Sequence, residues 1–367
     1  MKIAIVLNTS WNIYNFRLNL VKALLEIGHE VIAIAPKDEY SPRLIEAGCR
    51  YVEVKMDSRG VNPLKDIALT FELYRIFKGH RPDVILQYTI KPNIYGTFAA
   101  AVLKIPVINN VCGLGTAFLN KDLVSKIALL LYKLAFRFSS LVYFQNNEDK
   151  EFFINSKIIN KTKADLLPGS GVDLKRFVPS KSNKDNTPFT FLLISRLLHD
   201  KGILEFIDAI KILKSKGVNA KFQILGQIDE KHSRGIKKEL IDDWINEDFI
   251  EYLGSTDDVR PYINYADCIV LPSYREGTSR SLLEAASSAK PIITTDVPGC
   301  NNVVQHNVNG FLCESKNAND LAEKIEDMLT LDKSMLNKMG EEGSKIVESR
   351  FNEKIVINKY LTSIAMV

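Results

Sequence analysis

The sequence predicts an α/β fold with two domains, each built on a parallel sheet that helices cover on both faces. Short apolar runs of strand length alternate with longer amphipathic runs, which is typical of βαβ units. This alternation stops once, in a polar stretch near the middle of the 367 residues, and then starts again. A chain of this length commonly forms two domains of roughly 100–200 residues each.

The first half of the chain contains six apolar runs of strand length. They cover residues 3–7, 30–35, 51–55, 84–88, 107–111 and 141–145. The segments between them have helical spacing, for example 16–27 and 63–77. Because the runs are almost continuously apolar, we expect strands that are buried on both faces of a parallel sheet.

Residues 172–188 interrupt this pattern. They are polar and contain two prolines, a composition typical of a linker. The alternation restarts in the second half, with strand-like runs at 189–194, 221–225, 250–253, 268–271 and 291–294. We therefore predict domains at 1–172 and 173–350, facing each other across a cleft at the carboxyl ends of their strands, where open sheets bind ligands.

Composition excludes several classes of protein. The 48 Lys and Arg against 44 Asp and Glu give a net charge of +4, too small to favour a nucleic acid as partner. Five dispersed cysteines without a CxxC pair indicate reduced thiols in the cytoplasm. The first residues lack the pattern of a signal peptide, and no run approaches the roughly 18 apolar residues of a membrane span. We expect a cytoplasmic protein, at most peripheral to the inner face of the cell membrane.

The sharpest motif is at 274–285, which reads Tyr-Arg-Glu-Gly-Thr-Ser-Arg-Ser-Leu-Leu-Glu-Ala and follows the predicted strand 268–271. Gly277 permits a tight turn before a helix. Three hydroxyl side chains are able to cap that helix, namely Thr278, Ser279 and Ser281. The amides at such a helix start suit a phosphate or a sugar hydroxyl.

Two glutamates, Glu276 and Glu284, belong to this motif. The alternative to a binding role is that Ser281 and Glu284 form a capping box while Glu276 is a surface carboxylate. Eight helical residues rise about 12 Å. Because that exceeds the roughly 5–9.5 Å between the carboxyl groups of a glycosidase pair, the two glutamates are expected to contact different parts of one long ligand.

A second motif, at 195–202, follows the predicted strand 189–194 and contains Arg196 and Lys201. Two cations at the carboxyl end of a strand are able to neutralise a diphosphate without a metal, although they are also compatible with an ordinary solvated loop. The histidines and cysteines show no metal-ligand spacing. Walker, dinucleotide-binding and G-x-S-x-G motifs are absent from the sequence.

Together these motifs resemble a known family. Arg196-x4-Lys201-Gly202 followed by Glu276-x7-Glu284 resembles the retaining family-4 glycosyltransferases, whose GT-B architecture has two facing Rossmann-like domains. The first half, through 14–17, Lys91-x-Asn93 and 113–115, is similar to bacterial enzymes that add N-acetylgalactosamine to undecaprenyl-diphosphate-linked saccharides. The resemblance also implies that a final helix, 351–367, returns to the first domain.

The resemblance implies roles for residues of the second domain. Arg196 and Lys201 would bind the donor diphosphate, and Glu276 would hold the donor sugar. The remaining donor-binding residues implied in this way are Gly277, Thr278, Ser279, Glu284, Gly226, Leu253 and Gly254. Glu284 would contact the ribose, and the last three would line the base and ribose pocket. No metal or other cofactor is implied.

In the first domain, the resemblance implies an acceptor site. Its residues would be Asn12, Arg17, Lys91, Asn93, Gly113 and Gly115. The chain departs from the family at 8–12, where many members have a glycine-rich loop, and at 111–113, where many place a histidine. A histidine base is therefore not expected. In the same-face mechanism proposed for such enzymes, a donor phosphate oxygen takes the acceptor proton.

Residues 121–138 have helical spacing and place Lys126, Lys133 and Arg137 on one face among apolar residues. This pattern is compatible with a helix lying on anionic lipid headgroups, and also with a core helix that has a cationic edge.

The predicted activity is retaining, metal-independent transfer of an N-acetylhexosamine from a UDP-sugar to a lipid-linked glycan, in the assembly of a cell-surface polysaccharide or a glycoprotein glycan. Two alternatives remain: a sugar-nucleotide epimerase of the same architecture, and a sugar-binding protein without catalytic activity.

Overall fold

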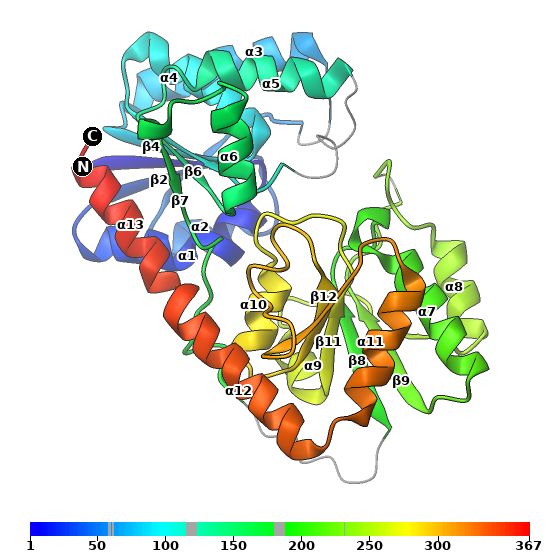
Figure 1. Cartoon of the computed structure of the whole chain (residues 1–367). Helices are drawn as coiled ribbons and strands as arrows, with labels where there is room; N and C mark the ends of the chain where they lie inside the picture. The colour runs from blue at the N-terminus through cyan, green and yellow to red at the C-terminus, as the bar shows by residue number, and fades with distance from the viewer. Residues whose placement is uncertain (58–59, 61, 115–122, 180–187, 231) are drawn as a thin grey trace. The chain divides into compact units, whose positions relative to one another are not determined.

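A computed structural model describes residues 1–57, 60, 62–114, 123–179, 188–230 and 232–367. The chain divides into two compact units (Figure 1). The first contains Met1–Ser170 and Lys354–Val367, and the second contains Gly171–Glu353. Each unit is a parallel sheet with helices on both faces.

The sheet of the first unit has seven parallel strands in the order β3-β2-β1-β4-β5-β6-β7. The strands are β1 (Lys2–Val6), β2 (Glu30–Ala35), β3 (Arg50–Glu53), β4 (Val84–Tyr88), β5 (Val107–Val111), β6 (Leu141–Phe144) and β7 (Ala164–Leu166). The chain moves outward from β1 to β3 and then crosses back to β4. The strand order therefore reverses between β1 and β4.

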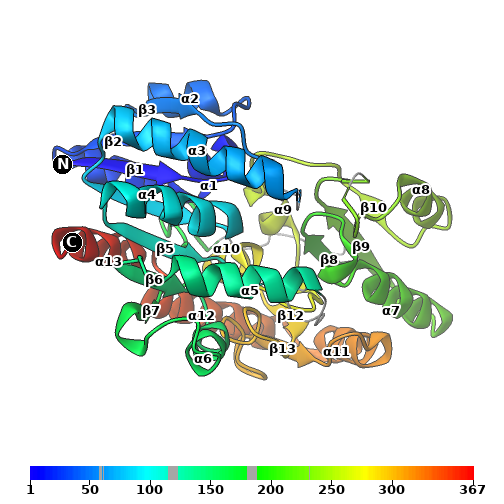
Figure 2. The same cartoon turned by 90° about the horizontal axis from the view of Figure 1, so that it is seen from above.

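Helices cover both faces of this sheet (Figures 1 and 2). One face packs against α1 (Ser10–Glu26), α2 (Ser41–Glu46) and α13 (Glu353–Ala365). The other packs against α3 (Pro63–His80), the π-helix η1 (Pro92–Gly96), α4 (Thr97–Leu103), α5 (Leu123–Ala135) and α6 (Asn147–Asn155). A short 3-10 helix, η3 (Lys161–Lys163), precedes β7.

The second unit repeats the arrangement with six parallel strands in the order β10-β9-β8-β11-β12-β13. They are β8 (Phe189–Ile194), β9 (Ala220–Leu225), β10 (Glu251–Tyr252), β11 (Cys268–Leu271), β12 (Ile292–Thr295) and β13 (Gly310–Cys313). Its helices are η4 (His199–Lys201), α7 (Ile203–Ser215), α8 (Lys238–Asn246), α9 (Arg260–Tyr265), α10 (Arg280–Ser287), α11 (Ala318–Thr330) and α12 (Lys333–Arg350). Here the strand order reverses between β8 and β11.

The predicted fold class is confirmed. Each predicted run corresponds to a strand of one of the two parallel sheets, and β4, β5 and β11 are buried along their whole length. The sequence analysis missed two edge strands, β7 and β13, which are only three and four residues long. It also placed the start of α1 too late, at residue 16. Thr9 caps this helix by accepting a hydrogen bond from the Asn12 amide, so α1 begins at Ser10.

The first part of the predicted linker is packed. Val172 and Phe177 are buried in the core of the second unit, and the Val172 amide donates to the Phe351 carbonyl at 2.9 Å. Residues 180–187 lie outside the described part of the chain. The two units divide after residues 170 and 353, against the predicted 172 and 350.

Two further observations concern the whole chain. All five cysteines are free thiols. Within the described ranges, no helix combines the length and apolar character needed to cross a membrane.

Candidate active site

The candidate donor site lies where the second sheet reverses its strand order. Open α/β sheets bind ligands at the carboxyl ends of their strands, next to such a reversal. The loop that follows β8 contains Lys201, and the loop that follows β11 contains Glu276. Lys201 and Glu276 are distant in sequence, but each follows one of the two strands that flank the reversal of strand order.

Lys201 and Glu276 form a salt bridge through Nζ and Oε1. Their side chains are only 17% and 15% exposed. Ser273 donates a second hydrogen bond, at 2.8 Å, to the same glutamate oxygen. Charges withdrawn from water to this extent need partners. The cation predicted to bind the diphosphate and the carboxylate predicted to bind the sugar therefore neutralise each other.

Asp200 ties the two loops together. Its carbonyl accepts a hydrogen bond from the Tyr274 amide at 2.9 Å and lies 3.1 Å from Ser273 Oγ, whose one proton it shares with Glu276. Its carboxylate forms a 3.0 Å ion pair with Arg234. Burial alone would raise the pKa of Asp200, but the hydrogen bond and the charge of Arg234 bring that pKa below its usual value. The sequence analysis assigned no role to Asp200 or Arg234, because no pattern relates residues 34 positions apart.

Gly202 allows the same loops to approach closely. It has a φ of +72°, and a Cβ atom at this position would lie 2.0 Å from the Pro272 carbonyl oxygen. Any side chain at this position would push the loops apart. The close approach of the loops therefore explains the glycine in the predicted Arg196-x4-Lys201-Gly202 motif.

A Pro-Gly turn after β12 holds the backbone of the Glu276 loop. The Glu276 amide donates to the Pro298 carbonyl and the Ser279 amide donates to the Gly299 carbonyl, each at 3.0 Å. Gly299 has a φ of +85°, and a Cβ there would lie 2.3 Å from the Glu276 carbonyl oxygen. The sequence analysis missed this turn, although a Pro-Gly dipeptide after a strand is a recognisable signal.

Arg196 differs from Lys201 in its surroundings. Its side chain is exposed and makes no salt bridge with any described residue, whereas its carbonyl accepts the Leu198 amide at 2.8 Å. Of the two predicted diphosphate-binding cations, Lys201 is paired and Arg196 is open to solvent.

Glu284 is separate from the Lys201–Glu276 pair. Its carboxylate accepts a 2.8 Å hydrogen bond from Arg280 Nε, and Arg280 Nη1 also donates to the Gly171 carbonyl at 2.8 Å. The capping expectations need correction. Ser279 occupies the N-cap position of α10, and its hydroxyl makes no capping hydrogen bond. Ser281 lies inside the helix and not at its N-cap, so Ser281 and Glu284 do not form the capping box considered above.

The three residues predicted for the base and ribose pocket lie together at the carboxyl edge. The Gly226 amide donates to the Gly254 carbonyl at 2.8 Å, and the Leu253 amide donates to Ile224 at 2.9 Å. A Cβ at Gly226 would lie 1.6 Å from the Ser195 carbonyl oxygen. Glycine at this position therefore lets the end of β9 approach the 195–202 loop closely.

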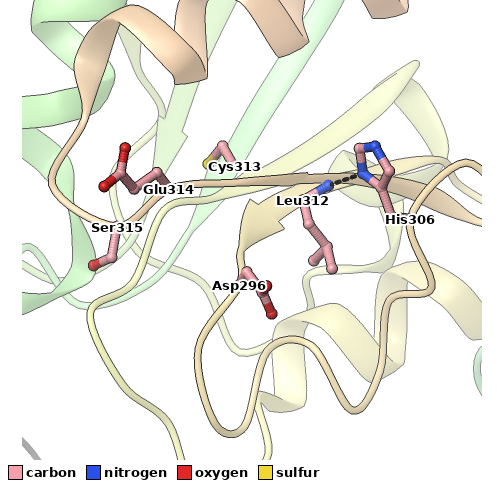
Figure 3. A pocket seen from close by; sticks show the side chains of 6 residues that line it. All are labelled: Asp296, His306, Leu312, Cys313, Glu314 and Ser315. Atoms are coloured by element: carbon pink, nitrogen blue, oxygen red, sulfur yellow. Dashed lines mark hydrogen bonds between the residues drawn. The ribbon is translucent and has the colours of Figure 1, made fainter.

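A pocket of about 710 Å³ opens beyond the ends of β12 and β13 (Figure 3). It is lined by Asp296, His306, Leu312, Cys313, Glu314 and Ser315, and His306 Nδ1 accepts the Leu312 amide at 3.0 Å. None of the predicted site residues lines it. Because its lining contains two carboxylates and neither Lys nor Arg, this pocket does not suit a diphosphate.

The first unit also has polar residues at its point of strand reversal. Arg17 of α1 is only 5% exposed and its guanidinium stacks on the Tyr88 ring, 4.5 Å from the centroid. Nη1 donates to the Phe16 carbonyl at 2.9 Å, while Nε is buried without a partner. Among the described residues, no carboxylate forms a salt bridge with Arg17.

The neighbours of Arg17 remain neutral at pH 7. Burial raises the pKa of Tyr88 to about 12 and raises the pKa of the Cys112 thiol. Burial likewise raises the pKa of Tyr360, on α13, well above its usual value. Within the described part of the chain, no ionised side chain therefore balances the charge of this buried guanidinium.

Thr89, directly after β4, has a φ of +66°, an outlier for a β-branched residue. Its hydroxyl and Asn93 Oδ1 are both buried without a partner, whereas Asn93 Nδ2 donates to the Asn110 carbonyl at 2.9 Å. Asn93 belongs to the π-helix η1. Backbone strain and π-helical turns both concentrate at functional sites.

The other predicted acceptor residues have varied surroundings. Lys91 forms a 2.7 Å buried ion pair with Asp66, and Tyr95 donates to the same carboxylate at 2.9 Å. Asn12 lies in the first turn of α1, and Gly113 has a φ of +103°. Gly115 lies outside the described residues. Within the described ranges, no cluster of three His, Cys, Asp or Glu side chains is suitable for a metal ion.

Family models match both halves of the chain. Residues 175–346 match the model for glycosyl transferases group 1, and residues 2–146 match a glycosyl transferase 4-like model. The N,N'-diacetylbacillosaminyl-diphospho-undecaprenol alpha-1,3-N-acetylgalactosaminyltransferase of Campylobacter jejuni is 30% identical, over 98% of this chain and 97% of that protein. The chain belongs to the group 1 glycosyltransferases.

Other similar proteins extend the comparison of this group 1 glycosyltransferase. The UDP-Gal:alpha-D-GlcNAc-diphosphoundecaprenol alpha-1,3-galactosyltransferase of Escherichia coli is 26% identical over 80% of this chain and 78% of that protein. The structure of HepE from Anabaena with UDP and glucose superposes with a TM-score of 0.83 at 18% identity, covering all of both chains. At that identity the likeness shows the fold, and the two Rossmann-like units are those of a GT-B glycosyltransferase.

Proposed function

We propose that this glycosyltransferase moves an N-acetylhexosamine, with retention of configuration, from a UDP-sugar to a saccharide linked to undecaprenyl diphosphate. The names of the Campylobacter and Escherichia relatives support the acceptor class, and the first also supports N-acetylgalactosamine as the sugar. The UDP bound in HepE supports the nucleotide.

The observation that carries this proposal is the Lys201–Glu276 pair, together with the exposed Arg196 in the same loop as Lys201. A diphosphate bound here would take Lys201 away from Glu276, because a doubly charged ligand attracts the ammonium more strongly than one carboxylate does. Glu276 would then accept hydrogen bonds from sugar hydroxyls in place of the one from Lys201. Its neighbours Gly277 and Thr278 would offer backbone amides to the same sugar, whereas Ser279, whose amide donates to the Gly299 carbonyl, would contact the sugar through its hydroxyl.

The nucleoside would extend along the edge formed by Gly226, Leu253 and Gly254, whose backbones are in contact. Glu284 would accept the ribose hydroxyls. Because Arg280 already holds its carboxylate through a 2.8 Å hydrogen bond, Glu284 would be oriented before the ligand arrives.

For the acceptor, we propose that its diphosphate approaches Arg17. The observation behind this assignment is a buried guanidinium without a carboxylate partner among the described residues, beside the unpartnered polar atoms of Thr89 and Asn93. Lys91, Asn12, Gly113 and Gly115 complete the predicted acceptor set. Lys91 would act through its ion pair with Asp66, which fixes its position.

In the proposed reaction, the bond from the sugar C1 to the donor phosphate oxygen breaks. The acceptor hydroxyl forms its new bond to C1 on the same face, and its proton passes to that phosphate oxygen. The role of the protein is to position both substrates and to stabilise the departing diphosphate with Arg196 and Lys201. We propose that no metal ion is needed, since these two cations supply the positive charge.

The lipid-linked acceptors in the names of the relatives support a reaction at a membrane, and we place it at the cytoplasmic face. The product would serve in the assembly of a surface polysaccharide or of a glycoprotein glycan.

A donor screen tests the proposal. UDP-, GDP- and ADP-sugars would be incubated with a diphosphoundecaprenol-linked saccharide, with and without EDTA, and products would be analysed by NMR. We expect transfer from a UDP-N-acetylhexosamine, an α-linked product from the α-linked donor, and no effect of EDTA. Conversion of the donor without acceptor would support the epimerase instead, and UDP-sugar binding without turnover would support a sugar-binding protein.

A further inference from the structure

Helix α5 exposes an apolar face. It buries Ser125, Tyr132 and Ala135. Four large apolar side chains recur on its outer side at spacings of four, three and four residues, and are exposed by 72%, 50%, 56% and 38%: Leu123, Ile127, Leu130 and Leu134. A core helix with a cationic edge, the alternative considered for residues 121–138, does not have such a face.

Helix α3 repeats this feature. It buries Leu69, Leu73 and Phe77 against the sheet. On its outer side Leu64, Ile67 and Phe71 are exposed by 78%, 55% and 66%, again at helical spacing. Isolated exposed apolar residues are ordinary, but seven on the outer faces of two helices need an explanation.

The fully exposed charged residues of both helices are basic. Arg75 and Lys78 are exposed on α3, as are Lys126 on α5 and Arg137 just after it. The acidic residues of α3 face inward: Asp66 is buried with Lys91, and Glu72 is half-buried and accepts the Lys55 amide at 3.0 Å. Helix α5 contains no acidic residue.

The topology places the starts of both helices at the same end of the sheet, where the parallel strands have their carboxyl ends. Helix α3 leads from β3 to β4 and α5 leads from β5 to β6, so both begin at the carboxyl edge of the parallel strands and run back (Figure 2). Both also pack against η1, which contains Asn93. On α3 the exposed apolar side chains lie in the first half of the helix, and Arg75 and Lys78 lie farther from the carboxyl edge. On α5 they run along the whole helix, with Lys126 in its first turn and Arg137 just after its end.

We propose that α3 and α5 together form a docking surface for an anionic lipid bilayer, with their exposed apolar side chains in the headgroup region beside the acceptor site. The inference rests on the proposed function, which it deepens by adding the membrane that presents the acceptor. Apolar side chains flanked by cations, without exposed carboxylates, match the chemistry of an anionic interface. If a second copy of this chain docked here through the same surface, cations would face cations and repel each other.

Vesicle sedimentation of the full chain tests this surface. The probes are vesicles of phosphatidylglycerol with phosphatidylethanolamine, and vesicles of phosphatidylcholine alone. The variants are Ile67→Ser with Phe71→Ser on α3, and Ile127→Ser with Leu130→Ser on α5. The matched control is Ile45→Ser on α2, which is 57% exposed but belongs to the opposite face of the sheet.

We expect the wild type to bind anionic vesicles at least about tenfold more tightly than phosphatidylcholine. Each double variant should weaken that binding by at least about tenfold, and Ile45→Ser should leave it unchanged. Normal binding by the α3 variant would overturn the two-helix surface. The membrane assignment would be overturned if the wild type did not bind vesicles. It would also be overturned if the wild type formed a dimer that the variants lost, while none of the proteins bound lipid.

The proposed function is tested separately. Both variants should retain transfer to a short-chain, water-soluble acceptor, since neither changes a site residue. If the wild type binds vesicles but transfers no sugar, the proposed function fails while the docking surface remains.

Discussion

Lys201 and Glu276 form a salt bridge between the two loops that flank the strand reversal of the second sheet. Each supplies the opposite charge that the other needs in a mostly buried position. The pair is therefore a neutral unit that a diphosphate-sugar ligand could open, with its phosphates taking Lys201 and its sugar taking Glu276.

The first prediction concerns this pair. Lys201→Ala and Glu276→Ala should each lower transfer by at least about 100-fold, because each would remove a group that we propose stabilises the donor or the departing diphosphate. Steady-state kinetics with UDP-N-acetylgalactosamine measures this. Lys211→Ala on α7, which removes a surface lysine paired with Asp208, is the control and should leave kcat unchanged.

The same variants separate activity from stability. Each single change takes the opposite charge away from a mostly buried side chain, so the double variant should unfold at a higher temperature than either single variant. Thermal unfolding measures the difference. If the loss of stability in the double variant equalled the sum of the two single losses, the two side chains would not interact.

The second prediction concerns Gly299. Gly299→Ala should lower kcat and destabilise the protein by about 3 kcal/mol or more, because its Cβ would displace the Glu276 backbone. Gly217 has a similar φ of +75°, and a Cβ added there would meet nothing within 4 Å. Gly217→Ala should therefore cost only about 1–2 kcal/mol and leave kcat unchanged. Equal effects of the two substitutions would contradict the contact.

The third prediction concerns pH. The pKa of Asp200 is lower in the folded protein than its ordinary value, so the unfolded chain binds more protons. The contribution of Asp200 to stability is thus fully present above about pH 4 and is lost as the pH falls through the lowered pKa. In chemical unfolding over this range, Asp200→Asn should flatten the acid loss of stability. Asp208→Asn, an exposed aspartate paired with Lys211, should not.

The fourth prediction concerns Arg17. Arg17→Met should raise the acceptor KM by at least about tenfold while the Kd for UDP stays unchanged, since the residue belongs to the first unit. Because the substitution removes a buried cation that has no ionic partner among the described residues, stability should be unchanged or higher. Arg43→Met provides the control: Arg43 also stacks on tyrosine, 4.6 Å from the Tyr40 ring centroid, but is exposed. A rise in acceptor KM in both variants would reject the assignment.

The sequence was sufficient for the fold class because strands that are buried on both faces are apolar throughout, as in β4 and β11. It was not sufficient for β7 and β13, since three or four residues at the edge of a sheet carry too little pattern. The start of α1 was missed because its first turn, Ser-Trp-Asn-Ile, lacks helical apolar spacing, although the Thr9 cap was present.

Within the candidate site, the sequence motifs pointed to Lys201 and Glu276 because each follows a recognisable strand. The residues that hold the loops of Lys201 and Glu276 in place were not predictable in the same way. Arg234 reaches Asp200 from a loop whose path no periodicity describes, and the Pro298-Gly299 turn has meaning only once its contact with Glu276 is seen. The partners of Lys91 and Glu284 also depend on packing, so their proposed roles remain predictions.

The central claim is that Lys201 binds the diphosphate while Glu276 binds the sugar, and isothermal titration calorimetry tests it most directly. UDP and UDP-N-acetylgalactosamine would be titrated into the wild type, Lys201→Met and Glu276→Gln. We predict that Lys201→Met weakens both ligands, whereas Glu276→Gln retains UDP affinity and loses the additional affinity due to the sugar. Failure of UDP to bind the wild type, or equal weakening of both ligands by Glu276→Gln, would contradict the account.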